Sequence, residues 1–249
     1  MTRRPVVAGA VFVLVLTVLG VGAFCLQQML YREPPVVDLT PRTDPPAAVA
    51  APVARPVRGG RDSTVPQLDP RWVARTARAA GIPEVALSAY ARAELQAPAG
   101  CGLGWTTLAG IGWVESHHGT IAERTLLADG RSSSPILGPA LDGVGPVAAI
   151  PATPEGTALH GDPRWDHALG PMQFLTGTWE SWGADGDGDG VADPFDLDDA
   201  ALAAARYLCA DGRDLTTGTG WSGGVLSYNR SEEYLLAVHA AASTYADRA

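Results

Sequence analysis

The sequence contains no lysine, so all 18 of its basic residues are arginines, and its formal net charge is −9. The deficit of positive charge is largest after residue 66, where eleven arginines stand against 23 acidic residues. A domain this acidic repels the phosphates of nucleic acids and of anionic lipids, so we expect its partner to be neutral or positively charged. The absence of lysine itself we attribute to a compositional bias that also favours alanine, glycine and proline.

Signals for β-strands are also scarce, and no internal repeat is visible. Helix caps and apolar spacing predict helices over residues 70–80, 84–96, 103–118, 171–182, 198–210, 221–229 and 231–246. The stretch 120–168 is rich in glycine, proline, aspartate and serine and has no sustained periodicity. Loops this long are uncommon unless they wall a functional cleft. The sequence therefore predicts an all-α domain over residues 67–249 with one long loop.

Residues 5–30 carry no charged side chain, and they are apolar as far as Leu26 apart from Thr17. About twenty such residues span a bilayer as a helix. Arg3 and Arg4 place the preceding end in the cytoplasm by the positive-inside rule, and hence everything after about residue 31 outside. We predict a cytoplasmic N-terminus and a single transmembrane helix over residues 1–30. The alternative is a signal peptide, whose cleavage would leave a secreted protein.

A proline-rich stretch without apolar periodicity follows, over residues 31–66. Segments of this composition stay extended and solvated. We expect a disordered linker that lifts the domain away from the membrane.

Two cysteines, Cys101 and Cys209, lie in the part of the chain expected outside the cytoplasm. In an oxidising compartment two such residues are more often paired than free. A disulfide between them would close a long loop and stabilise the domain by several kcal/mol. The alternative is two unrelated buried thiols.

A carboxylate lies on the expected interior face of the helix at 103–118. Leu108, Ile111 and Gly112 share this face, and Glu115 continues it. Burial there would raise the pKa of the carboxyl group, as a general acid requires. Gly110 and Gly112 each cost a helix interior about 1 kcal/mol relative to alanine, so another group is expected to pack or bind close by. From periodicity alone, a glutamate at the edge of the face that reaches solvent is equally expected.

Three short motifs follow one another along the domain. They are GWVESHHG at residues 112–119, GPMQF at 170–174, and SYN at 227–229 with Tyr234 beyond. Their order and separation resemble the lytic murein transglycosylase family, most closely its MltB-like branch as found in actinobacteria, over about residues 67–246. The resemblance implies a lysozyme-like α-helical fold. It also implies cleavage of the β-1,4 bond between N-acetylmuramic acid and N-acetylglucosamine in the glycan strands of peptidoglycan.

The resemblance also implies roles for single residues. By motif position Glu115 corresponds to the catalytic acid/base. The substrate-binding candidates are Ser116, Met172, Gln173, Tyr228, Asn229 and Tyr234. For Met172, Tyr228 and Tyr234 the alternative is packing in the core. The chain departs from the family pattern at Thr176-Gly177, where relatives usually have Pro-Ser, so substrate contacts are expected to differ in detail.

The motifs contain no second acid, although Asp162 and Asp166 in the long loop remain candidates. A lysozyme-type hydrolase needs a second carboxylate. With Glu115 alone, the resemblance implies a non-hydrolytic lyase reaction in which Glu115 acts first as acid and then as base, closing a 1,6-anhydro ring. The alternatives are a hydrolytic muramidase on the same fold and a non-catalytic domain that binds the cell wall.

Residues 185–196 fit a twelve-residue, EF-hand-like calcium loop. The expected ligands are Asp185, Asp187, Asp189, the backbone carbonyl of Val191, Asp193 and Asp196. Carboxylates this close repel one another unless a cation gathers them, so we expect a structural Ca²⁺ and no organic cofactor. The alternative is a solvated acidic turn. The five histidines show no metal-ligand spacing, and the sequence identifies no protein partner.

Overall fold

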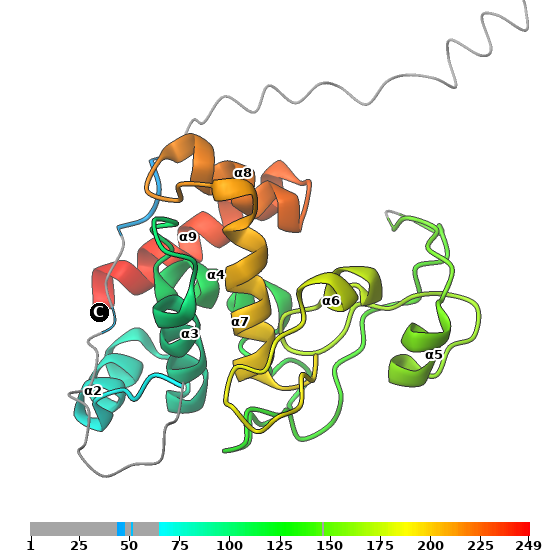
Figure 1. The fold of residues 1–249 in the computed structure, drawn as a ribbon, viewed down its shortest axis with the longest axis horizontal. Helices are drawn as coiled ribbons and strands as arrows, with labels where there is room; N and C mark the ends of the chain where they lie inside the picture. The colour runs from blue at the N-terminus through cyan, green and yellow to red at the C-terminus, as the bar shows by residue number, and fades with distance from the viewer. Residues whose placement is uncertain (1–43, 48–50, 52–64, 146) are drawn as a thin grey trace, which may run out of the picture. The chain divides into compact units, whose positions relative to one another are not determined.

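The structure, a computed structural model, describes residues 44–47, 51, 65–145 and 147–249. Within these ranges the chain forms helices and loops, and its β-structure is confined to isolated bridges between single residues. The helices, shown in Figure 1, are α2 (Pro70–Ala80), α3 (Glu84–Gln96), α4 (Trp105–Ser116), α5 (Pro154–His160), α6 (Thr176–Trp182), α7 (Leu197–Leu208), the 3₁₀ turn η1 (Ala210–Gly212), α8 (Gly218–Tyr228) and α9 (Glu232–Arg248). The predicted helical class is confirmed for the described residues.

Helix α4 lies at the centre of the packing and contacts α9, α3 and α7. All of its residues from Trp105 to Gly112 are buried, so it has no solvent-facing side there. The single interior face expected from periodicity is therefore wrong, because neighbouring helices cover this helix all round. A Cβ at Gly110 would lie 2.8 Å from the carbonyl oxygen of Val238, and one at Gly112 would collide with the Tyr90 hydroxyl. The close neighbours predicted from these glycines are protein groups.

Local caps explain why α2 begins and ends at the predicted residues. The Asp69 carboxylate accepts a hydrogen bond from the backbone N–H of Arg71, Pro70 occupies the first position, and Gly81 ends the helix in the left-handed region at φ 75°. The prediction that Ser231 caps α9 is also confirmed, since its hydroxyl accepts from the backbone N–H of Tyr234.

Helix α6 begins five residues later than predicted. Leu169 and Phe174 exchange two backbone hydrogen bonds of 2.8 and 3.0 Å, which close the intervening residues into a turn. Gln173 adopts the left-handed region at φ 51°, which is incompatible with a helix. Elsewhere the predicted bounds differ from α4, α7, α8 and α9 by three residues or fewer at each end.

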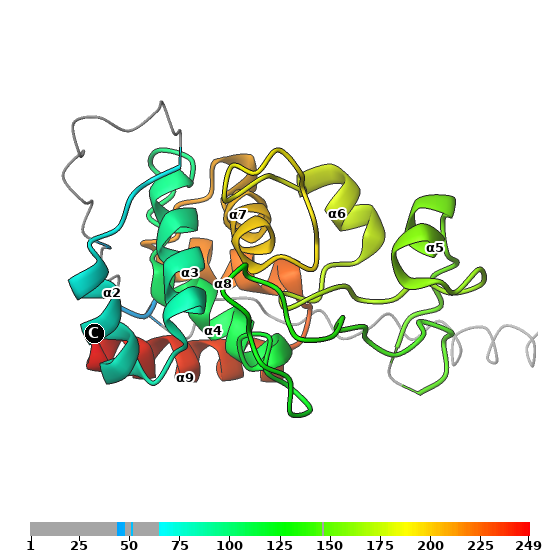
Figure 2. The same cartoon turned by 90° about the horizontal axis from the view of Figure 1, so that it is seen from below.

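The long segment between α4 and α6 contains α5, which was not predicted. Helix α5 lies on the side of α6 that faces away from α7, as both views show (Figures 1 and 2). Antiparallel bridges pair Leu137 with Leu169 and Pro151 with Trp165, so the segment folds back against the turn at residues 170–174.

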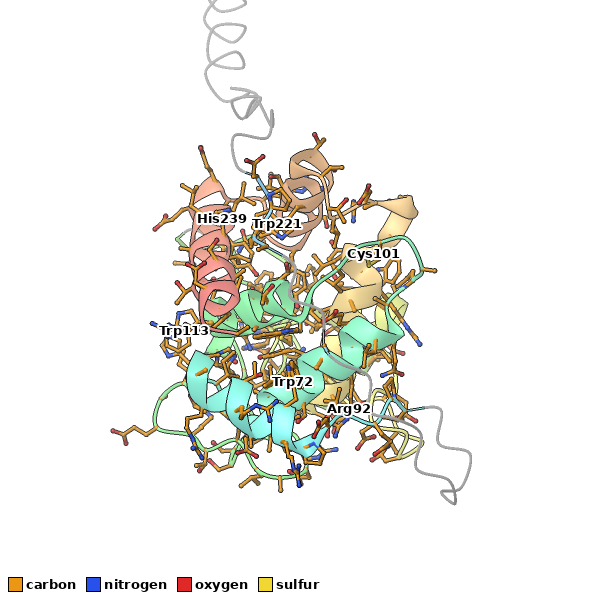
Figure 3. All side chains as sticks on the ribbon, turned by 90° about the vertical axis from the view of Figure 1, so that its left-hand side faces the viewer. Trp72, Arg92, Cys101, Trp113, Trp221 and His239 are labelled. Atoms are coloured by element: carbon orange, nitrogen blue, oxygen red, sulfur yellow. A yellow bond between two sulfur atoms is a disulfide. The ribbon has the colours of Figure 1, made fainter. Side chains whose placement is uncertain are left out.

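Part of the predicted linker packs on the domain. Ala51 is 5% exposed, and its backbone N–H donates to the Glu94 carboxylate over 3.3 Å. The carbonyl oxygen of Asp44 lies 3.0 Å from Nε2 of His239, a residue shown beside Trp221 in Figure 3. Ala51 is thus buried on the domain, whereas most of the predicted linker at residues 31–66 lies outside the described residues.

In the described ranges, no helix combines the length and apolar character needed to cross a bilayer. The membrane helix predicted within residues 1–30 lies outside the described residues.

Cys101 and Cys209 form the predicted disulfide, with their Cα atoms 5.5 Å apart. It joins the segment before α4, visible at the Cys101 label in Figure 3, to the end of α7.

Candidate active site

Glu115 lies in the last turn of α4 and is partly buried. Its Oε1 accepts a hydrogen bond of 2.5 Å from the hydroxyl of Tyr234 in α9. Burial raises the pKa of Glu115 to about 7, and the bond from Tyr234 lowers it in part. The burial of Glu115 agrees with the elevation predicted from the sequence, and a carboxyl group with this pKa can hold a proton near neutral pH and release it.

The end of α4 is tied to the turn at residues 170–174. The hydroxyl of Ser116 donates to the carbonyl oxygen of Pro171 over 2.6 Å and accepts from the backbone N–H of Gly119 over 2.7 Å. Gly170 permits this turn to approach the chain before α7, because a Cβ there would collide with the carbonyl oxygen of Pro194. The first two sequence motifs are therefore one structural unit.

Tyr228 links the third motif to the same turn. Its hydroxyl donates to the carbonyl oxygen of Met172 over 2.7 Å, and its ring packs edge-on against Phe174. Burial raises the pKa of Tyr228 well above its ordinary value, and nearby Glu115 adds to the shift. The titratable groups that face Glu115 are thus two tyrosine hydroxyls, that of Tyr228 from α8 and that of Tyr234 from α9, and both are neutral.

The substrate-binding candidates divide into two groups. Gln173 and Tyr228 are partly exposed, and Asn229 is exposed at the end of α8. Ser116 and Met172 are fully buried, and Tyr234 is 7% exposed and bonded to Glu115. The expectation that Ser116 and Met172 contact substrate through their side chains is therefore contradicted by their burial, since both fill internal positions.

The two candidate second acids serve the long loop instead. Asp166 is buried and accepts hydrogen bonds from the hydroxyl and backbone N–H of Thr176. Asp162 accepts from the backbone N–H of Arg164, which, with further bonds, holds the pKa of its carboxyl below the ordinary value. Both carboxylates thus hold loop backbone in place.

Two of the predicted metal ligands in the acidic loop lie close together, and a third aspartate that was not predicted lies beside them. Oxygens of Asp185, Asp187 and Asp199 lie within 4.8 Å of one another. Asp196 is instead the N-cap of α7, where it accepts from the backbone N–H of Asp198. Twelve-residue spacing could not identify Asp199, because it lies in the first turn of the following helix.

The other predicted ligands have different contacts. Asp193 forms an ion pair with Arg131, and Asp189 accepts from the backbone N–H of Val191, whose side chain is exposed. Burial, followed by repulsion from Asp187 and Asp185, raises the pKa of Asp199 to about 6. Oxygen-only donors of this kind suit a hard divalent cation such as Ca²⁺.

Part of the chain matches a known protein family. Residues 159–225 match the family described as "Transglycosylase SLT domain". The matched segment spans the turn at 170–174, the acidic loop, α7 and most of α8, and leaves Glu115 outside it. This match supports an enzyme that acts on peptidoglycan and a lysozyme-like helical fold.

No match was found among curated proteins. Among solved structures, the chain is similar to the Escherichia coli lytic transglycosylase Slt35 in complex with bulgecin A, at 16% sequence identity and a TM-score of 0.43. The similarity covers 72% of this chain and 75% of that chain.

Proposed function

We propose that the protein is a peptidoglycan lytic transglycosylase with Glu115 as its acid and base. The observation that supports this most directly is the partly buried carboxyl group of Glu115. Its pKa lies near 7, and the motif at 170–174 and Tyr228 pack around the end of its helix. The family match at residues 159–225 supplies the substrate class.

The proposed reaction is the one that the resemblance implies, with a single carboxyl group that serves first as acid and then as base. Glu115 donates its proton to the glycosidic oxygen, the bond from that oxygen to the anomeric carbon of N-acetylmuramic acid breaks, and the substrate's own N-acetyl group stabilises the positive centre. The Glu115 carboxylate then removes the proton of the 6-hydroxyl, whose oxygen bonds to the anomeric carbon. The products are a 1,6-anhydro sugar and a free 4-hydroxyl, and Glu115 is protonated again. Water is not consumed.

The exposed members of the candidate set are the substrate contacts in this proposal. Gln173 and Tyr228 would contact the glycan strand, and Asn229 would donate hydrogen bonds to the N-acetyl group. Tyr234 keeps the Glu115 carboxylate oriented through its 2.5 Å hydrogen bond.

The proposal predicts the chemistry of the products. Digestion of purified peptidoglycan in H₂¹⁸O, followed by mass spectrometry, should yield muropeptides with anhydro ends and without ¹⁸O at the cleaved position. Muropeptides with reducing ends that carry ¹⁸O would assign the protein to the hydrolytic muramidases instead, with water activated by a second acid. An undigested substrate would favour a wall-binding domain.

We further propose that the domain works outside the cytoplasm, held at the membrane by a helix within residues 1–30. The acidic, disulfide-bonded domain and the uncharged N-terminal stretch support this location. A secreted form released by signal-peptide cleavage is the alternative.

We propose that Asp185, Asp187 and Asp199 hold a structural Ca²⁺ that stabilises the loop against α7. Removal of Ca²⁺ by EGTA should lower the melting temperature of the purified protein by about 5–10 °C, and added Ca²⁺ should restore it. Scanning calorimetry with and without chelator measures the effect.

An Asp187→Asn variant should lose this response to Ca²⁺, because it lacks one of the three gathered carboxylates. An Asp211→Asn variant alters an exposed carboxylate outside the loop and should respond like the unaltered protein. A melting temperature that is the same with chelator and with Ca²⁺ would refute the site.

A further inference from the structure

His118 lies two residues beyond the end of α4 and is 2% exposed. Its Nδ1 lies 3.0 Å from the hydroxyl of Tyr90 in α3, and its Nε2 lies 2.9 Å from the hydroxyl of Tyr245 in α9. Burial lowers the pKa of His118 to about 3, so the ring is neutral. A neutral imidazole has one donor and one acceptor nitrogen, so one tyrosine donates to the ring and the other accepts from it.

The backbone at His117 and His118 has a conformation that side-chain contacts must stabilise. His117 and His118 both adopt the left-handed region, at φ 52° and 60°, a conformation that is uncommon for residues other than glycine. The backbone N–H of His118 also donates to the carbonyl oxygen of Gly112, one turn before Glu115. The buried ring therefore helps to hold the sharp turn that ends α4 directly after Glu115 and Ser116.

Two hydrogen bonds join the end of α4 to α9. The first runs from Tyr234 to Glu115, and the second joins Tyr245 to His118. Because both tyrosines belong to one helix, the second link helps to hold the Tyr234 hydroxyl beside Glu115, together with the packing of α9 against Gly110. On the other side, the Tyr90 hydroxyl packs against Gly112 and so connects α3 to the same turn.

We propose that His118 is a positioning residue that holds the end of α4 between Tyr90 and Tyr245, so that Glu115 keeps its hydrogen bond to Tyr234. The catalytic consequence rests on the proposed function, whereas the effect on the Glu115 carboxyl group does not. The titratable groups that face Glu115 are Tyr228 and Tyr234. The hydrogen bond from Tyr234 favours the ionised form of the Glu115 carboxyl group and so lowers its pKa. Loss of the link between His118 and α9 weakens this bond, and the titration of Glu115 therefore moves to higher pH.

The sharpest test is Tyr245→Phe, which removes one hydroxyl and keeps the ring. In this variant kcat should fall about tenfold while KM stays within about twofold, because positioning acts on the transition state. The midpoint of Glu115, followed by ¹³C NMR of its carboxyl carbon, should rise by about 0.5 pH units or more. His118→Phe should show the same changes, and His118→Gln, which keeps hydrogen-bonding groups, should recover part of them.

The matched control is His117→Asn. His117 is the exposed neighbour in the same backbone region, and asparagine tolerates that conformation. This variant should retain the unaltered kcat and the unaltered Glu115 midpoint.

Each of the following results either overturns the positioning role of His118 or separates it from the proposed function. A Tyr245→Phe protein whose kcat and Glu115 midpoint equal those of the unaltered protein overturns the proposal, as does one that melts at lower temperature with no change in either. If the unaltered protein releases no anhydro products but Tyr245→Phe still shifts the Glu115 midpoint, the positioning role stands and the proposed function fails. Should His118→Phe not fold, Tyr245→Phe alone decides.

Discussion

Replacement of Glu115 by glutamine is expected to lower the rate of glycan cleavage about a thousandfold, within the range that a positioned general acid contributes. Glutamine has nearly the same shape and can still accept the hydrogen bond from Tyr234, but it can neither donate the proton to the leaving oxygen nor take one from the 6-hydroxyl. Release of soluble muropeptides from purified peptidoglycan, compared at equal protein concentration, measures the loss.

The fold should survive this replacement. The pKa of Glu115 is raised in the folded protein, so its ionisation lowers stability as pH rises from about 4.5 to about 7. A neutral glutamine is free of that cost, and the melting temperature of Glu115→Gln at pH 8 should therefore be no lower than that of the unaltered protein. Glu123→Gln, in the exposed loop that follows α4, is the matched control and should keep full activity. A Glu115→Gln protein that cleaves at the unaltered rate would remove Glu115 from the mechanism.

Loss of the Cys101–Cys209 disulfide is expected to lower the free energy of unfolding by about 4 kcal/mol, because the bridge closes a loop of more than one hundred residues in the unfolded chain. The sequence separation is 108 residues, and both cysteines are buried. The bridge also lies beside a backbone hydrogen bond of 2.7 Å from Leu215 to the carbonyl oxygen of Cys101. The chain after α7 is thus held close to the start of α4.

The melting temperature of a Cys101→Ala/Cys209→Ala protein should accordingly fall by about 10 °C. Calorimetry of the unaltered protein with and without reductant should show a similar difference, and the double variant should not respond to reductant. A double variant that melts at the unaltered temperature would show that the bridge contributes little to stability.

Helices with strong local signals could be predicted from the sequence to the residue. Pro70 and Gly81 mark the ends of α2, and Pro83 precedes α3, because proline and glycine restrict or permit backbone conformations independently of the surrounding fold. Ser231 identifies the start of α9 for a similar reason, since its hydroxyl replaces a missing backbone acceptor.

Features that depend on long-range contacts could not be predicted in the same way. The burial of α4 on all sides comes from elements distant in the sequence, among them α3, α7, α8 and α9, and leaves no periodic pattern. The turn at residues 170–174 is fixed by pairing of Leu169 with Phe174 and by the Ser116 hydroxyl, contacts that no local rule anticipates. The packing of Ala51 depends on Glu94, a residue far along the chain.

In the candidate site too, some residues could be predicted from the sequence and others depend on long-range contacts. Glu115, Gln173 and Asn229 could be found through motif resemblance, and the raised pKa of Glu115 follows from its place at the end of a buried helix. His118 could not, because a histidine at a helix end ordinarily lies at the surface. Its role becomes visible only when Tyr90 and Tyr245 are seen on either side of it.

The proposed reaction depends most on the protonation of Glu115, and direct titration of its carboxyl carbon by ¹³C NMR measures this protonation in the absence of substrate. The structure predicts a midpoint near pH 7, with cleavage that falls about tenfold per pH unit above it, because only the protonated group can donate. A midpoint near the ordinary 4.5 would mean that Glu115 is ionised throughout the neutral range, and would contradict its role as the acid.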